Sequence, residues 1–180
     1  MTDHNKKIEI IKTNITYIKD YPKAGVIFQD ITSITENNES FALTIEVMQE
    51  TLKGIECDKI AGIEARGFIF GAALAKIMNK GFVAIRKKNK LPREVISKTY
   101  ALEYGTDTIE MHKDSIKPNE RVIIIDDILA TGGTMNAAIE IIREAKGIVD
   151  TVAVISEITE LKGASLIAEK NVTTKSLIAT

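Results

Sequence analysis

The sequence predicts an α/β fold in which helices flank a mostly parallel, twisted sheet. Apolar runs at Val122–Ile125 and within Val149–Ile155 are typical of strands buried on both faces of a parallel sheet. Segments whose apolar residues follow a helical period alternate with these runs, as in sheets covered by helices. The 180 residues, 44% of them hydrophobic, suffice for a single domain spanning residues 1–180.

The first expected element is a helix near the N-terminus. Its isoleucines from Ile8 to Ile18 recur with a helical period, and Pro22 and Gly25 then break the pattern. We therefore expect this helix to end near Asp20.

The later elements alternate between helix and strand. In order, they are a helix over residues 40–52, a strand over 59–63, a helix over 68–78, a strand over 82–85, the strand that begins at 122, a helix from 135, a strand over 149–155, a short helix over 163–169 and a last strand over 174–178. Residues 87–107 differ, because they carry charge, Pro92 and Gly105 but few apolar periods. Long excursions of this kind are often functional, so we expect a flexible lid here.

The stretch from Val122 to Thr134 is the strongest functional signal. Asp126 and Asp127 directly follow the apolar run, and parallel sheets bind ligands beyond the carboxyl ends of their strands. The turn after them consists of Ala130, Thr131, Gly132, Gly133 and Thr134. Its glycines and hydroxyl groups, placed ahead of a helical pattern, are typical of an anion site at a helix N-terminus. Because paired carboxylates suit vicinal hydroxyls or a metal, the combination predicts a site for a phosphorylated sugar.

Two other interpretations of this stretch are weaker. A strand that ends in two aspartates also holds magnesium in nucleotide hydrolases, but those enzymes need a separate G-x-x-x-x-G-K-[S/T] loop. The nearest match, Gly62–Gly67, is followed by Phe68 and Ile69 where a lysine and a hydroxyl residue must stand. The other alternative, a buried strand and glycine turn without any ligand, does not account for the whole thirteen-residue pattern.

The composition argues against several classes of protein. The formal net charge is −1, from 24 basic and 25 acidic residues, which gives no overall charge for nucleic acid or a membrane surface. Cys57 is the only cysteine, which excludes an intramolecular disulfide and suits a reducing compartment. Residues 1–7 lack the apolar stretch of a signal peptide, and no run reaches the ~20 apolar residues that span a bilayer. We expect a cytoplasmic protein with small-molecule substrates and no nucleic-acid or membrane partner.

Three further segments carry candidate site residues. The turn Glu64–Phe68 follows an expected strand and opens a helix, so its backbone N–H groups and Arg66 are candidates for binding a second anion. Arg86–Pro92 places four cations in five residues. Such a run alone is usually a solvated loop, but beside two anion-binding turns a binding role is favoured. Leu102–Gly105 offers a carboxyl group and an aromatic ring that would close over a site, although a β-hairpin turn with surface residues is the alternative.

These motifs resemble those of the adenine phosphoribosyltransferase family, within the type I phosphoribosyltransferases. The resemblance rests on Arg86–Pro92, Leu102–Gly105 and Asp126–Thr134, and it extends through Tyr21–Asp30 and Glu157–Gly163. It implies a Rossmann-like core, a small N-terminal hood over about residues 1–35 and a lid over about residues 87–107. It also implies transfer of the 5-phosphoribosyl group from 5-phosphoribosyl 1-pyrophosphate (the ribosyl donor) to adenine, giving AMP and pyrophosphate. Mg²⁺ bound through the substrate, without direct protein ligands, and a homodimer are implied as well.

The resemblance also implies a role for each site residue. Asp126 and Asp127 would hold the ribose hydroxyls, and the turn over residues 130–134 the 5-phosphate. Glu103 would act as the acid–base group. The implied pyrophosphate ligands are Ala65, Arg66, Gly67, Arg86, Lys87, Lys90 and Tyr104. The implied adenine contacts are Ile27, Phe28, Gln29 and Ile158.

Two residues depart from the family's usual pattern. Ala24 stands in place of proline, and Gln29 stands in place of arginine. The contact implied at Gln29 uses backbone atoms, so we expect activity to persist while hood rigidity and adenine affinity are in question. By contrast, Ala130 stands where enzymes for hypoxanthine and guanine usually carry aspartate, which favours adenine.

Two other functions stay open. A sensor of the ribosyl donor that lacks catalysis would share the fold, but such proteins usually carry a DNA-binding segment, and the N-terminal stretch is too short for one. A phosphoribosyltransferase for another base would differ only in the hood. His4 and His112 lie outside every motif, so we expect structural or solvent-exposed roles for them.

Overall fold

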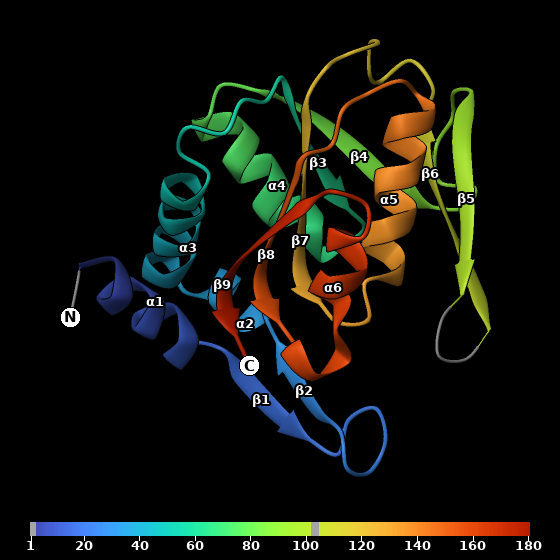
Figure 1. Ribbon diagram of the computed structural model, residues 1–180. Coiled ribbons are helices and arrows are strands. Elements are labelled where there is room, and N and C mark those ends of the chain that lie inside the picture. Colours follow the sequence, from blue (N-terminus) through green and yellow to red (C-terminus); the bar gives the residue numbers. More distant parts are fainter. Residues whose placement is uncertain (1–2, 102–104) are drawn as a thin grey trace. The chain divides into compact units, whose positions relative to one another are not determined.

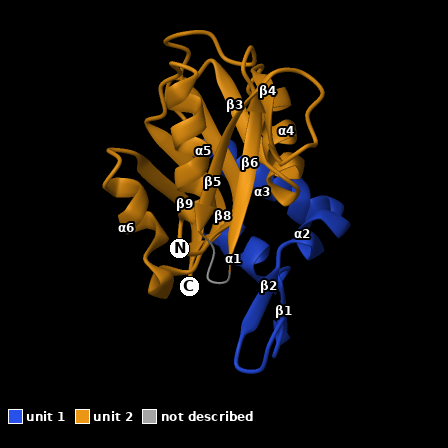
Figure 2. Ribbon diagram, turned by 90° about the vertical axis from the view of Figure 1, so that its right-hand side faces the viewer, with its two compact units in different colours: residues 1–52 blue, residues 53–180 orange. Residues whose placement is uncertain are grey.

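The computed structural model of the protein describes residues 3–101 and 105–180 (Figure 1). The chain divides after Leu52 into two compact units, residues 1–52 and residues 53–180 (Figure 2). Within the described ranges, no helix is long and apolar enough to cross a membrane.

The first unit combines three helices with a two-stranded hairpin. Its elements are α1 (Asp3–Thr13), β1 (Thr16–Lys19), β2 (Ile27–Asp30), α2 (Thr32–Glu36) and α3 (Asn38–Thr51). Helix α1 packs on α3, where the Lys7 ammonium lies 2.7 Å from carboxylate oxygens of both Glu46 and Glu50. Helix α3 confirms the expected second helix, and Asn37 caps it by accepting a 2.9 Å hydrogen bond from the Ser40 N–H.

The expected end of the first helix near Asp20 is wrong. Helix α1 ends at Thr13, because the side-chain hydroxyl of Thr13 and the side-chain amide of Asn14 both donate to the backbone carbonyl of Ile10, at 2.8 Å each. The chain then turns into β1, which pairs antiparallel with β2. Residues 16–18 are β-branched or aromatic and therefore suit this strand, although the isoleucines continue the helical period.

The second unit is built on a seven-stranded sheet. Its strands are β3 (Lys59–Ile63), β4 (Gly81–Lys87), β5 (Val95–Ala101), β6 (Thr106–His112), β7 (Val122–Leu129), β8 (Thr151–Glu157) and β9 (Thr173–Ala179). The strand order is β5-β6-β4-β3-β7-β8-β9. The neighbouring strands β4, β3, β7, β8 and β9 pair in parallel. Strand β6 pairs antiparallel with both β4 and β5. The mostly parallel sheet is therefore confirmed.

Helices cover both faces of this sheet. They are α4 (Arg66–Ile77), α5 (Gly133–Glu144), η1 (Thr159–Leu161) and α6 (Gly163–Ala168). Helix α4 packs against β3 and β7, while α5 and α6 lie on the opposite face, as Figure 2 shows. The core between sheet and helices is aliphatic, with Ile85, Ile124 and Ile139 fully buried. This burial explains why β3, β7 and β8 are visible as apolar runs in the sequence.

Much of the excursion expected over residues 87–107 is regular structure. Strands β5 and β6 form an antiparallel hairpin in which Val95 lies opposite His112 and Ala101 opposite Thr106. The antiparallel pairing of β5 with β6 is therefore described, whereas residues 102–104 of the expected turn lie outside the described residues. Strand β7 is also longer than its apolar run, because pairing with β8 continues to Leu129 opposite Glu157.

Candidate active site

The turns after β3 and β7 meet at one edge of the sheet. The two strands are parallel neighbours, so their carboxyl ends lie side by side. Arg66, the first residue of α4, donates from its Nε to Asp127 Oδ2 in an ion pair. The structure thus brings together two residues that are 61 positions apart in the chain.

The paired aspartates at the end of β7 differ in their surroundings. Asp127 is buried, with 3% of its surface exposed, and its charge is balanced by Arg66. Asp126 is partly buried, and desolvation together with the neighbouring Asp127 carboxylate raises its pKa well above the ordinary value. An acceptor-rich pair of this kind is suited to hold hydroxyl groups and to stabilise positive charge.

The turn that follows β7 is shaped for an anion. Gly132 has φ = +84°, in the left-handed region that favours glycine, and α5 begins directly after it. No side chain in the described ranges caps α5, and its first intrahelical bond runs from the Asn136 N–H to the Gly132 carbonyl at 2.8 Å. The N–H groups of the first turn therefore point toward a free helix end, where an anion is stabilised.

A close contact with α6 holds this turn in place. A Cβ atom on Gly163 would lie 2.2 Å from the Ala130 carbonyl oxygen, so only glycine fits there without displacing the backbone. The residues expected to bind the 5-phosphate are therefore supported by a segment that follows β8.

The cationic segment after β4 is fixed to the turn after β3. Arg86 donates from Nε and Nη2 to the two oxygens of Glu64, at 3.1 and 3.2 Å, and lowers the pKa of that carboxyl. The Lys87 backbone N–H donates to the same carboxylate at 2.9 Å. Arg86 also donates from Nη1 to the Lys90 carbonyl at 3.1 Å. The structure therefore brings Arg86, Lys87 and Lys90 beside the turn that carries Arg66.

The Lys87 side chain turns toward the β5–β6 hairpin. It forms an ion pair with Asp107, and its Nζ lies 3.3 Å from the Tyr100 hydroxyl. Partial burial disfavours the ammonium, but these hydrogen bonds outweigh burial and raise the pKa of Lys87. The same contact, led by the hydrogen bond from Lys87, lowers the pKa of Asp107.

The other expected site residues fall into three places. Ile27, Phe28 and Gln29 lie on β2 in the first unit, where the rings of Phe28 and Tyr21 are 5.1 Å apart. Ile158 follows β8, and its N–H donates to the Leu129 carbonyl at 2.9 Å. Glu103 and Tyr104 lie outside the described residues.

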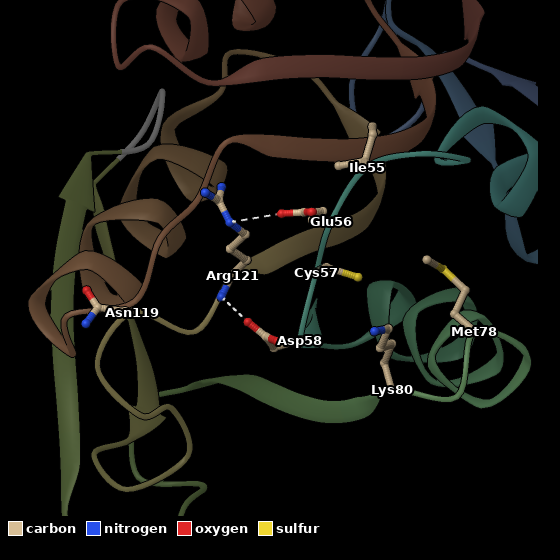
Figure 3. A pocket seen from close by; sticks show the side chains of 8 residues that line it. All are labelled: Ile55, Glu56, Cys57, Asp58, Met78, Lys80, Asn119 and Arg121. Carbon is tan, nitrogen blue, oxygen red and sulfur yellow. Dashed lines mark hydrogen bonds and ion pairs between the residues drawn. The ribbon is translucent and has the colours of Figure 1, made fainter.

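A separate cavity of about 410 Å³ lies at the opposite, amino ends of β3, β4 and β7 (Figure 3). Its Arg121 forms an ion pair with Asp150, lies 3.8 Å from Glu56 and donates from its backbone to Asp58 at 2.7 Å. Cys57 also lines the cavity, but burial raises the pKa of its thiol and disfavours the reactive thiolate. The edge that carries Arg66 and Asp127 is therefore the better candidate site.

Comparison with known proteins identifies the family. Residues 30–175 match the phosphoribosyl transferase domain. Over 178 residues, the chain is 45% identical to adenine phosphoribosyltransferase of Salmonella heidelberg (strain SL476), covering 99% of this chain and 97% of the relative. The chain belongs to the adenine phosphoribosyltransferase family.

Solved structures of adenine phosphoribosyltransferases share the fold. The enzyme from Thermoanaerobacter pseudethanolicus superimposes with a TM-score of 0.92 at 43% identity, covering 96% of this chain and 99% of that one. The Saccharomyces cerevisiae enzyme, complexed with adenine and an imino-altritol bisphosphate, gives 0.89 at 33% identity, covering 96% and 99%. The resemblance predicted from the sequence motifs is thus confirmed.

Two acids that form ion pairs with the candidate cations were given no role from the sequence. Glu64 anchors Arg86, and Asp107 holds Lys87. The only sequence signal for either is an acid close to a cationic motif. Such a signal is too common on surfaces to identify a partner.

Proposed function

We propose that the protein transfers the 5-phosphoribosyl group of 5-phosphoribosyl 1-pyrophosphate to N9 of adenine. The products are AMP and pyrophosphate, formed with inversion at the anomeric carbon in a purine salvage step. The observation that carries the proposal is the contact between Arg66 and Asp127, because it joins the two anion-binding turns at one sheet edge. The yeast relative, complexed with adenine and a bisphosphate, supports the same substrate class.

The residues at this edge have separate roles, which are to bind the 5-phosphate, to bind the ribose and to neutralise the pyrophosphate. The turn over residues 130–134 holds the 5-phosphate, and Asp126 and Asp127 hold the ribose hydroxyls and favour the positive charge of an oxocarbenium-like transition state. The leaving pyrophosphate is neutralised by cations that follow β3 and β4. These pyrophosphate ligands are Ala65, Arg66, Gly67, Arg86, Lys87, Lys90 and Tyr104.

A separate set of residues contacts the adenine base. Ile27, Phe28 and Gln29 of the N-terminal hood contact adenine, and Ile158 packs against its ring. Glu103 supports proton movement near N7 as N9 attacks. These assignments follow from the family resemblance, residue by residue.

Magnesium fits this site through the substrate. The Asp127 carboxylate is already paired with Arg66, so its charge is balanced without a metal ion. Mg²⁺ prefers to keep water and phosphate oxygens as ligands, and when bound it adds positive charge at the pyrophosphate. The protein's own cations supply the remaining charge.

The cellular setting follows from composition and resemblance. A single, buried cysteine suits a reducing compartment, which supports a cytoplasmic enzyme. We assign a homodimer because the family is generally dimeric. Sedimentation of the purified protein tests the dimer, and a monomer at micromolar concentration would contradict it.

Pyrophosphate release tests the reaction itself. The purified protein is supplied with Mg²⁺ and the ribosyl donor, and adenine, hypoxanthine, guanine and xanthine are offered in parallel. Release with adenine alone is expected, and Glu103→Ala and Asp127→Asn should suppress it. Release with another base overturns the adenine assignment, whereas donor binding without turnover on any base favours a sensor.

A further inference from the structure

We propose that Glu64 is a positioning residue of the pyrophosphate subsite, whose single carboxylate sets the geometry of the cationic segment 86–90. The inference rests on the proposed function, because that function assigns pyrophosphate to this segment. Glu64 itself makes no contact with substrate in this proposal and acts through Arg86 and the backbone.

The Glu64 carboxylate accepts three hydrogen bonds from the segment that ends β4. Oε2 accepts from Arg86 Nε at 3.1 Å, and Oε1 accepts from Arg86 Nη2 at 3.2 Å. This two-point contact fixes both the position and the plane of the guanidinium. Oε2 also accepts the Lys87 N–H at 2.9 Å, while the Glu64 N–H donates to the Ile85 carbonyl at 2.9 Å. The turn after β3 is thereby tied to the end of β4 through both backbone and side chain.

The loop after β4 is held by further hydrogen bonds from Arg86 and Asn89. With one edge of its guanidinium held by Glu64, Arg86 directs Nη1 to the Lys90 carbonyl at 3.1 Å. Asn89, which has φ = +64°, donates its N–H to the buried carboxylate of Glu110 at 2.9 Å. These two hydrogen bonds therefore fold the loop back. The bond from Arg86, whose guanidinium is held by Glu64, is the one nearer the turn that carries Arg66.

Positioning by Glu64 and the simple electrostatic effect of its charge act on pyrophosphate binding in opposite directions. The Arg86 guanidinium lowers the pKa of Glu64, so this side chain is negatively charged at neutral pH, beside a site for a highly negative ligand. Through charge alone, removing it would strengthen pyrophosphate binding. Through positioning, removing it weakens binding, because Arg86, Lys87 and Lys90 lose their fixed arrangement. The two explanations predict opposite signs for one substitution.

Glu64→Gln provides that test, since the glutamine keeps the shape but cannot accept from both sides of the guanidinium. Calorimetry measures binding of two probes separately, pyrophosphate with Mg²⁺ and ribose 5-phosphate, to the full-length wild type and variant. We expect the pyrophosphate Kd to rise about tenfold or more, with the ribose 5-phosphate Kd unchanged. In turnover with adenine, KM for the ribosyl donor should rise more than kcat falls.

The matched control is Glu94→Gln, which removes a carboxylate paired with Lys113 at 2.8 Å, with side chains 76% and 60% exposed. It should leave both Kd values unchanged. An unchanged or lower pyrophosphate Kd in Glu64→Gln overturns the inference, and so does an equal loss for both probes, which indicates general damage. Wild type that binds both probes but fails to turn over adenine refutes the proposed function while leaving this test in force. Wild type that does not bind pyrophosphate refutes both.

Discussion

The Lys87 ammonium and the Asp107 carboxylate form an ion pair that joins the cationic segment after β4 to the β5–β6 hairpin. Tyr100 lies opposite Asp107 in the hairpin, and its hydroxyl is 3.3 Å from both Lys87 Nζ and Asp107 Oδ2. The last residue of β5, Ala101, lies close to the turn after β7, because a Cβ atom added to Gly133 would lie 3.3 Å from the Ala101 carbonyl oxygen. The hairpin therefore lies close to both the cationic segment after β4 and the turn after β7.

Asp107→Asn should lower the pKa of Lys87, because burial disfavours the ammonium and only the hydrogen bonds to Asp107 and Tyr100 together outweigh that burial. Since both side chains are partly exposed, the loss in free energy of unfolding should be only about 0.5–1 kcal/mol. NMR titration of the lysine side chain measures the first effect, and urea unfolding the second. An unchanged Lys87 pKa would contradict the assigned contact.

The Lys87–Asp107 ion pair should stabilise the folded protein only within a range of pH. The pKa of Asp107 is lowered on folding, so its contribution is present above the unfolded value of about 3.9 and disappears as pH falls through the folded pKa. The pKa of Lys87 is raised, so its contribution is lost only as pH rises through that higher value. The stability difference between wild type and Asp107→Asn should therefore vanish at both extremes of pH.

Asp126→Asn should stabilise the protein at pH 7 while it reduces turnover. The pKa of Asp126 is raised on folding, so the ionised side chain destabilises the folded state above the unfolded pKa of about 3.9. Asparagine removes this cost, and each kcal/mol regained raises the melting temperature by roughly 2–4 °C. The gain should shrink as pH falls toward 4. Loss of a charge-stabilising group should lower kcat about 100-fold or more. Melting curves across pH and steady-state kinetics check both parts, and a lower melting temperature at pH 7 would count against the buried-charge argument.

Arg66→Gln should destabilise the protein and weaken donor binding together. The buried carboxylate of Asp127 loses its ion-pair partner, a loss that costs about 1–3 kcal/mol. Arg121→Gln is a suitable control, because it also removes an arginine paired with aspartate, but at the amino ends of the strands. Calorimetric unfolding and donor binding should change in Arg66→Gln, whereas donor binding should persist in the control. Equal donor affinity in both variants would remove Arg66 from the site.

The sequence located those parts of the fold and site that depend on local patterns. Strand β3 was expected over residues 59–63 and occupies them, since its residues are buried on both faces. The acids and turn of Asp126–Thr134 are consecutive in the chain, so one motif contains them.

Pairings between distant segments were not visible in the sequence. The isoleucine period continues through β1, but side-chain hydrogen bonds from Thr13 and Asn14 end α1, and the chain then pairs with β2. Glu64 and Arg86 are 22 positions apart, and Lys87 and Asp107 are 20 apart. Each partner is one acid among the 25 in the chain, so the pairing becomes evident only once the sheet brings β3, β4 and β6 together.

Gly163→Ala should impair the 5-phosphate turn without touching a ligand. The added methyl group would lie 2.2 Å from the Ala130 carbonyl oxygen and 3.0 Å from Leu129 Cγ, so the backbone of the turn must move. Overpacking of this kind costs about 1–3 kcal/mol, and the displaced turn should raise KM for the ribosyl donor. Gly81→Ala is the matched control, because its Cβ would meet only the flexible Lys59 side chain, at an ordinary 3.6 Å from Cγ and 3.9 Å from Cε. Urea unfolding and ribose 5-phosphate binding should change in the first variant and stay near wild type in the second. If Gly163→Ala binds ribose 5-phosphate normally, the turn over residues 130–134 does not depend on α6 for its shape.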